Sequence, residues 1–263
     1  PVRPLFVDGF KNEVLVIVVA NGCRDATADV ARATLDTHLP QGWTSAVLDL
    51  AEGSKPHALN AGDGWATHPT RVYLDADVRV SPGLLSSLAS VLATDAPRYA
   101  SGTPLIPDAR SAVTRAYARF WQELPFNRTA APGYGLFATN AAGRARWGAF
   151  PTIISDDTFA RLQFTPEERV QVSDTYFWPM TEGFAALARV RRRQDAGVRE
   201  LAALHPDLMA REGKPPLTAS ALLRLALSDL TGFATYAAVS LAVRLRPGGS
   251  LSLIHISEPT RLR

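Results

Sequence analysis

The stretch Arg71-Val-Tyr-Leu-Asp-Ala-Asp-Val78 joins a short apolar run to two carboxylates that are two residues apart. Residues 71–74 are typical of a buried strand, and Asp75 and Asp77 come directly after it. Open α/β sheets bind ligands beyond the carboxyl ends of their strands, so both side chains are expected to reach a crevice. Carboxylates suit Mg²⁺ or Mn²⁺, which also bridge diphosphate oxygens. The stretch predicts a metal site at Asp75 and Asp77, although chance surface carboxylates would give the same triplet.

Strands and helices alternate around this stretch. The run Val14-Leu-Val-Ile-Val-Val19 is typical of a strand buried on both faces. A turn follows, and then a helical pattern over residues 25–35, where Asp25 favours the helix N-terminus. The order recurs with strands at 46–50 and 71–74 and helices at 56–65 and 82–92. Such alternation is typical of right-handed βαβ crossovers and predicts an α/β fold with a mostly parallel open sheet flanked by helices. The loops at 20–25 and 75–78 should face one crevice.

The later part of the chain is less regular. Helices are expected at 111–123 and 156–162 and a strand at 136–139, with a Pro/Gly-rich loop at 125–135. Residues 217–245 are strongly apolar, but their longest uncharged run, 230–243, has 14 residues. A membrane-spanning helix needs about 20. We therefore expect a C-terminal helical tail that is buried or lies at a membrane interface.

Composition restricts the class of partner and the compartment. The sequence pI is near 9.3, but the net charge is only +3 and the basic residues cluster only at 189–193. Nucleic acid is therefore not an expected partner. The single cysteine, Cys23, cannot form an intrachain disulfide, which favours a reducing, cytoplasmic compartment.

Both ends of the sequence look atypical. The chain opens at Pro1 and reaches a strand-like run within about a dozen residues, which we interpret as an N-terminal truncation. The stretch Leu251-Ser-Leu-Ile-His-Ile-Ser-Glu-Pro-Thr-Arg261 resembles translated read-through of a sequencing adapter. The resulting division is a catalytic domain at 1–200, a helical segment at 201–248 and a non-native tail at 249–263.

Four motifs in order resemble glycosyltransferase family 2. The first is the helix-opening Lys55-Pro-His-Ala-Leu-Asn-Ala-Gly62, and Asp75-Ala-Asp77 follows its Asn60 after about 15 residues. Val18-Val-Ala-Asn-Gly-Cys-Arg-Asp-Ala-Thr27 resembles the family's second strand and loop. Ser155-Asp-Asp157 resembles its acidic pair near the acceptor, and Arg189-Val-Arg-Arg-Arg193 loosely resembles its late basic motif. The resemblance covers about residues 14 to 200.

This resemblance implies a fold and an activity. The fold is the GT-A fold of nucleotide-diphospho-sugar transferases, and the activity is a hexosyltransferase-like transfer (EC 2.4) with inversion at the anomeric carbon. Mg²⁺ or Mn²⁺ would be held by Asp77 with help from Asp75, while Asp157, beside Asp156, would take the proton of the acceptor hydroxyl. The implied donor contacts are Asn21, Asp25, Lys55, Asn60, Asp75, Asp77, Arg192 and Arg193.

The resemblance also implies substrates and a setting. The expected donor is a UDP-sugar, with GDP- and dTDP-sugars as alternatives. The acceptor would be a glycan, a lipid-linked molecule or a small molecule, as in the synthesis of cell-envelope polysaccharides. The expected location is the cytoplasm or the cytoplasmic face of the membrane, with peripheral membrane association through the C-terminal helices.

Some features depart from the family pattern. The family's first strand and loop would precede residue 1, and Asn21 stands where the family has an aspartate that binds the base. Asp156 and Asp157 also fit a helix cap and first turn, and residues 189–193 also fit a solvated helix face. A second enzyme class, a nucleotidyltransferase on a similar sheet, would need a Gly-rich phosphate loop with a following Arg and Lys near the start. The sequence shows no such loop. The remaining alternative is an inactive fragment or pseudoenzyme that only binds a nucleotide or a partner.

Overall fold

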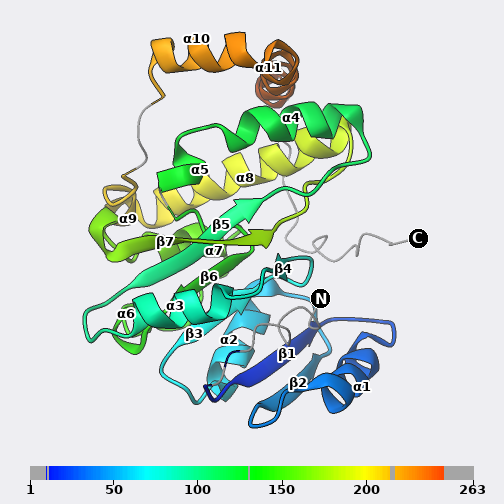
Figure 1. The fold of residues 1–263 in the computed structure, drawn as a ribbon, viewed down its shortest axis with the longest axis vertical. Helices are drawn as coiled ribbons and strands as arrows, with labels where there is room; N and C mark the ends of the chain where they lie inside the picture. Colours follow the sequence, from blue (N-terminus) through cyan, green and yellow to red (C-terminus); the bar gives the residue numbers. More distant parts are fainter. Residues whose placement is uncertain (1–9, 11, 130, 214–216, 246–263) are drawn as a thin grey trace.

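The computed structural model describes residues 10, 12–129, 131–213 and 217–245. Their strands form two sheets (Figure 1). In the first sheet β1 (Leu15–Asn21) pairs in parallel with β2 (Thr44–Leu50). The second sheet has the order β3-β6-β5-β7-β4. Its strands are β3 (Arg71–Leu74), β6 (Leu136–Thr139), β5 (Tyr99–Leu105), β7 (Arg169–Phe177) and β4 (Arg79–Val80).

The predicted α/β class is confirmed, but the pairing of the strands differs from the expectation in two ways. Within the described residues, the strands do not join into one open sheet, because β1 pairs only with β2 and β3 pairs only with β6. The second sheet is mixed: β5 and β7 are parallel, whereas β3–β6, β5–β6 and β4–β7 are antiparallel. Short apolar runs look alike in either direction, so the sequence could not distinguish them. The strand expected before residue 1 lies outside the described residues.

Helices cover both sheets (Figure 1). Near the N-terminus, α1 and α2 pack on the β1–β2 sheet, while α3 packs against β5 and β7. Further along the chain, α4 and α8 pack against each other, and α11 packs on both. The described helices are α1 (Thr27–His38), α2 (Lys55–Trp65), α3 (Leu84–Leu92), α4 (Ala112–Gln122), α5 (Phe126–Thr129), α6 (Ala141–Arg144), α7 (Asp156–Arg161), α8 (Phe184–Leu204), α9 (Pro206–Met209), α10 (Ala219–Ser228) and α11 (Leu230–Leu245).

The C-terminal helices are attached to the rest of the molecule through an aromatic and apolar core. Tyr117 and Phe120 of α4 pack against Tyr236 of α11, and Val239 is fully buried. Among the described residues, none of the helices combines the length and the apolar character that crossing a bilayer requires. The boundary proposed at residue 200 lies inside α8, and the tail proposed at 249–263 lies outside the described residues.

Candidate functional site

The Asp75-Ala-Asp77 segment forms a turn at the carboxyl end of β3. The main-chain N–H of Val78 donates to the carbonyl oxygen of Asp75 at 3.1 Å, which closes the turn. The N–H of Asp75 donates to the carbonyl oxygen of Gly135 at 2.8 Å, just before β6. Val78 is fully buried, whereas the side chain of Asp75 is 40% exposed and Asp77 is exposed. The buried valine thus anchors a turn whose two carboxylates face outward, at the predicted position.

A glycine allows a neighbouring loop to approach this turn closely. Gly135 has a φ of +66°, in the left-handed region, and a Cβ there would lie 2.7 Å from Cγ2 of Val78. It would also lie 3.1 Å from Cδ1 of Trp178. The preceding Tyr134 stacks on Trp178, with ring centroids 5.3 Å apart and an angle of 24° between the rings. An aromatic wall therefore stands beside the Asp75–Asp77 turn.

Lys55 joins this turn to the predicted acidic pair. Its Nζ lies 3.1 Å from Oδ1 of Asp75 and 3.1 Å from Oδ2 of Asp156. Lys55 is the first residue of α2, which is capped by Ser54, and Asp156 is the first residue of α7. The end of β3 and the starts of α2 and α7 thus meet at one ammonium group.

Burial and charge shift the pKa values of this cluster. The side chain of Asp156 is only 6% exposed, and burial, reinforced by Asp157 and Asp75, raises its pKa to about 6 against the opposing effect of Lys55. Burial lowers the pKa of Lys55, but the charges of Asp75, Asp156 and Asp157 outweigh it, so the pKa is raised overall. Partial loss of solvation and the charge of Asp75 raise the pKa of Asp77. The cluster therefore has an excess of negative charge, which a cation would relieve.

Asp157 follows Asp156 in α7, and its charge acts on both Lys55 and Tyr134. Its Oδ1 accepts a hydrogen bond from the N–H of Thr158 at 2.6 Å, so the carboxylate also fits the expected first-turn role in α7. Burial raises the pKa of Tyr134, and the negative charge of Asp157 adds to the increase. Asp157 itself is half-buried. Its second oxygen, Oδ2, accepts no hydrogen bond from the described part of the chain.

The two predicted donor contacts at and after the end of β1, Asn21 and Asp25, differ in their surroundings. Oδ1 of Asn21 accepts the N–H of Ser54 at 2.7 Å, which ties the end of β1 to the start of α2. Asn21 is thus joined through this loop to Lys55. Asp25 is exposed and accepts hydrogen bonds from the N–H and hydroxyl of Thr27, which lower its pKa. Its contacts are those of a local helix-start residue.

Asn60, one of the predicted donor contacts, holds two distant segments of the chain together. Its Nδ2 donates to the carbonyl oxygen of Phe150 at 3.0 Å, and its Oδ1 accepts the N–H of Phe150 at 2.6 Å. The amide is therefore engaged at both ends by one main-chain unit 90 residues away. Helical periodicity and motif resemblance could not reveal this contact. Asn60 fastens α2 to the loop that leads to α7.

We expect Asn60→Ala to lower the free energy of unfolding by about 1–3 kcal/mol, because both polar groups of Phe150 lose their partners. Denaturant unfolding followed by circular dichroism measures this change. If the free energy of unfolding is unaltered and nucleotide binding is weaker, Asn60 contacts the donor directly, as the sequence predicted.

The two arginines of the late basic motif lie in α8. Neither Arg192 nor Arg193 forms a hydrogen bond or ion pair with a residue that the structure describes, whereas Arg191 bonds to Asp195 and two tyrosines. Gly197 of the same helix touches Ser155, directly before Asp156. Arg193 lies one turn from Gly197, on the face of α8 that touches Ser155.

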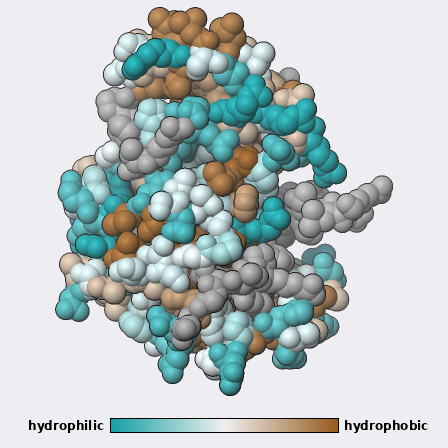
Figure 2. All heavy atoms as spheres, in the orientation of Figure 1, coloured by the Kyte–Doolittle hydropathy of each residue, from teal (hydrophilic) through white to brown (hydrophobic). Residues whose placement is uncertain are grey.

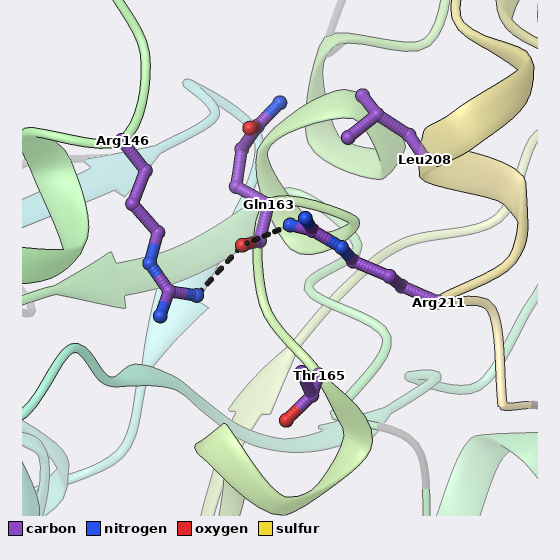
Figure 3. Close-up of a pocket in the computed structure, with 5 residues that line it drawn as sticks. All are labelled: Arg146, Gln163, Thr165, Leu208 and Arg211. Atoms are coloured by element: carbon purple, nitrogen blue, oxygen red, sulfur yellow. Dashed lines mark hydrogen bonds between the residues drawn. The ribbon is translucent and has the colours of Figure 1, made fainter.

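Other residues belong to the core or to a separate cavity. Phe120, Trp121 and Trp147 are buried in the core. Trp178 has no motif around it in the sequence, and the structure brings it beside Gly135, next to the Asp75–Asp77 turn. A cavity of about 390 Å³ lies elsewhere (Figure 3). Its Arg146 and Arg211 both donate to the carbonyl oxygen of Gln163, and none of the site carboxylates lines it.

The residues of the turn fit a divalent cation only with help from a ligand. No three histidine, cysteine, aspartate or glutamate side chains in the described part of the chain are grouped so that they could hold a metal ion. Asp75 and Asp77 offer hard oxygen atoms, and Mg²⁺ and Mn²⁺ commonly combine one or two carboxylates with water and phosphate oxygens. The donor set fits such a shared site.

Comparisons with known proteins identify a family and a similar fold. The model of the family described as Glycosyl transferase family 2 matches residues 8–147, more than half of the chain. No curated protein matches the sequence. Residues 1–349 of TarS from S. aureus, solved in complex with UDP, have a similar fold: the TM-score is 0.50 at 11% identity, over 92% of this chain and 86% of that chain. Glucosyl-3-phosphoglycerate synthase from Mycobacterium tuberculosis, in complex with Mn²⁺, UDP-glucose and glycerol 3-phosphate, has a TM-score of 0.45 at 14% identity, over 80% and 83%.

Proposed function

Because this chain belongs to glycosyl transferase family 2, we propose that it moves a sugar from a nucleotide-diphospho-sugar to an acceptor hydroxyl with inversion at the anomeric carbon. The observation that carries this proposal is the meeting of Lys55, Asp75 and Asp156 at the carboxyl end of β3, with Asp77 and Asp157 beside them. One cluster then holds groups for both the leaving diphosphate and the attacking hydroxyl.

The diphosphate side of the cluster consists of the turn and the lysine. Asp75 and Asp77 would hold Mg²⁺ or Mn²⁺ together with diphosphate oxygens. Such an ion, when bound, neutralises the negative charge that builds up on the departing diphosphate. Lys55 adds a positive charge from the start of α2, and Arg193 of α8 would add another. Asn21, which accepts the N–H of Ser54 next to Lys55, would contact the nucleoside.

The acceptor side consists of Asp157 and the aromatic wall. The acceptor oxygen forms a bond to the anomeric carbon as the bond to the diphosphate oxygen breaks, and the diphosphate leaves with the electron pair. Asp157 takes the proton of the attacking hydroxyl, which is the task of a general base. Asp156 is buried against Lys55 and acts as a positioning residue for the ammonium group. Tyr134 and Trp178 offer an aromatic surface for a sugar ring.

The proposal extends to substrate and location. A UDP-sugar is the first donor to test, since the TarS structure of the same fold contains UDP. The acceptor class includes a glycan, a lipid-linked molecule and a small molecule of cell-envelope synthesis. The single, exposed and unpaired Cys23 supports a cytoplasmic location.

We expect kcat/KM for sugar transfer to rise with pH through about 6. The pKa of Asp156 is about 6, so the group is neutral below that pH and charged above it. When Asp156 is neutral, Lys55 has only Asp75 as a direct ion-pair partner and competes with a cation for that carboxylate. Initial rates measured between pH 5 and 8 test this. In the Asp156→Asn variant, kcat/KM should stay low and should not rise as the pH passes through about 6. A rise like that of wild type in this variant would assign the titration to another group.

The proposed activity is tested by measuring release of nucleoside diphosphate from a panel of UDP-, GDP- and dTDP-sugars with Mn²⁺, with and without candidate acceptors. We expect release of nucleoside diphosphate from one nucleotide class, and we expect an acceptor to accelerate it. Mass spectrometry should then detect the sugar attached to that acceptor. If no donor is turned over, the proposal fails: nucleotide binding without turnover would favour the binding-only alternative, and absence of both would favour the inactive fragment.

A further inference from the structure

The outer faces of α10 and α11 carry leucines that are more than half exposed. In α10, Leu223 and Leu227 are 59% and 68% exposed, and they are followed by Leu230, which is 65% exposed. In α11, Leu241 and Leu245 are 56% and 72% exposed. The spacing of four residues places Leu223 and Leu227 on one face of α10, and Leu241 and Leu245 on one face of α11. Figure 2 shows hydrophobic residues gathered at the end of the molecule where Figure 1 places these helices.

The opposite faces of the two helices are fixed to the protein. Ala226 of α10 and Val239 and Val243 of α11 are buried, and α11 packs on α4 and α8. The exposed leucines therefore belong to helices that are already packed on the protein through their opposite faces. They form an outer surface on helices that are already anchored.

The charged side chains of α10 and α11 that have no partner in the described part of the chain are positive. Residues 217–245 contain three charged side chains, Arg224, Asp229 and Arg244. The carboxylate of Asp229 is paired with Arg119 at 3.1 Å and accepts the N–H of Gly232 at 2.9 Å. Arg224 and Arg244 are exposed and have no hydrogen bond or ion pair with the part of the chain that the structure describes. The leucine face is thus flanked by two free guanidinium groups, while its one acid is neutralised.

We propose that α10 and α11 bind the surface of a bilayer that contains anionic lipids, and lie in its plane. Leucines would enter the boundary between headgroups and acyl chains, while Arg224 and Arg244 would contact lipid phosphates. Neither helix has the length and apolar character needed to span a bilayer. A second copy docked symmetrically on this face would bring the same unpaired arginines together, which disfavours self-association. The proposal does not depend on the catalytic activity.

Co-sedimentation with vesicles tests the proposal. The chain should bind vesicles of equal parts phosphatidylglycerol and phosphatidylcholine, and more weakly vesicles of phosphatidylcholine alone. In the double variant Leu227→Gln/Leu241→Gln, the ratio of bound to free protein should fall at least about tenfold, since two apolar side chains no longer insert. The matched control is Val30→Gln on α1, at the other end of Figure 1, where Val30 is 61% exposed; its binding should equal that of wild type.

The charge component is tested with Arg224→Gln/Arg244→Gln. This variant should bind the anionic vesicles about tenfold less tightly or weaker still and show a smaller dependence on salt. All variants change exposed side chains, so their thermal unfolding and UDP binding should match wild type. Equal sedimentation of the leucine variant and wild type would overturn the proposal. So would absence of vesicle binding together with a dimer, seen by sedimentation velocity, that the leucine substitutions dissociate.

Discussion

Replacing Asp77 by alanine is expected to reduce the rate of sugar transfer by at least about a thousandfold. The substitution removes one of the two carboxylates on the turn after β3 and leaves Asp75 already shared with Lys55. Val78, which anchors the turn, is retained, so the fold should be preserved. Initial rates of nucleotide release over a range of Mn²⁺ concentrations measure the effect.

The matched control for this experiment is Asp29→Ala. Asp29 lies on α1, its side chain is 81% exposed, and it pairs with Arg32 across one helical turn. Such surface pairs contribute little to stability, so the rate of this variant should equal that of wild type. A wild-type rate in Asp77→Ala at every Mn²⁺ concentration would remove the turn from the proposed site.

Replacing Asp157 by asparagine is expected to lower kcat by about 10² to 10⁴, the usual contribution of a general base. The asparagine oxygen can still accept the N–H of Thr158, so the start of α7 should keep its structure. The affinity for UDP should be unchanged, because Asp157 serves the acceptor and not the diphosphate. Steady-state rates and calorimetric binding on the same preparation separate these effects.

Two results would argue against this role. A wild-type kcat in Asp157→Asn would leave the residue as a first-turn acid of α7, the alternative that the sequence also allowed. A loss of UDP affinity equal to the loss of rate would place Asp157 on the donor side. Asp156→Asn provides the comparison, since it should act through Lys55 and the pH profile.

The sequence predicted the elements whose signals are local. The apolar run before Asp75 predicted β3, and the helical patterns at 25–35, 56–65, 82–92 and 111–123 correspond to α1 to α4 within a few residues. The Asp75–Asp77 turn also lies where the pattern placed it, because a strand end followed by two polar residues depends on neighbouring positions only.

Contacts between distant residues were beyond such reasoning. The pairing of Lys55 with Asp156 joins residues about 100 positions apart, and the antiparallel placement of β6 between β3 and β5 depends on how the chain returns from α5. No motif surrounds Trp178 in the sequence. It lies close to Gly135 because β7, which ends just before Trp178, and β6, which begins just after Gly135, belong to the same sheet. Asn60 was assigned by resemblance, whereas its partners lie in a loop with no periodic pattern.

The central claim is that the turn at Asp75 and Asp77 binds the diphosphate of a nucleotide-sugar together with a divalent cation. The most direct test is isothermal titration of UDP, and then GDP, into the purified chain with Mn²⁺ and with EDTA, repeated on Asp77→Ala. We predict binding that requires Mn²⁺ and is lost in Asp77→Ala while thermal unfolding stays the same. Binding that is equally tight in EDTA and in Asp77→Ala, or no binding of either nucleotide, would contradict the claim.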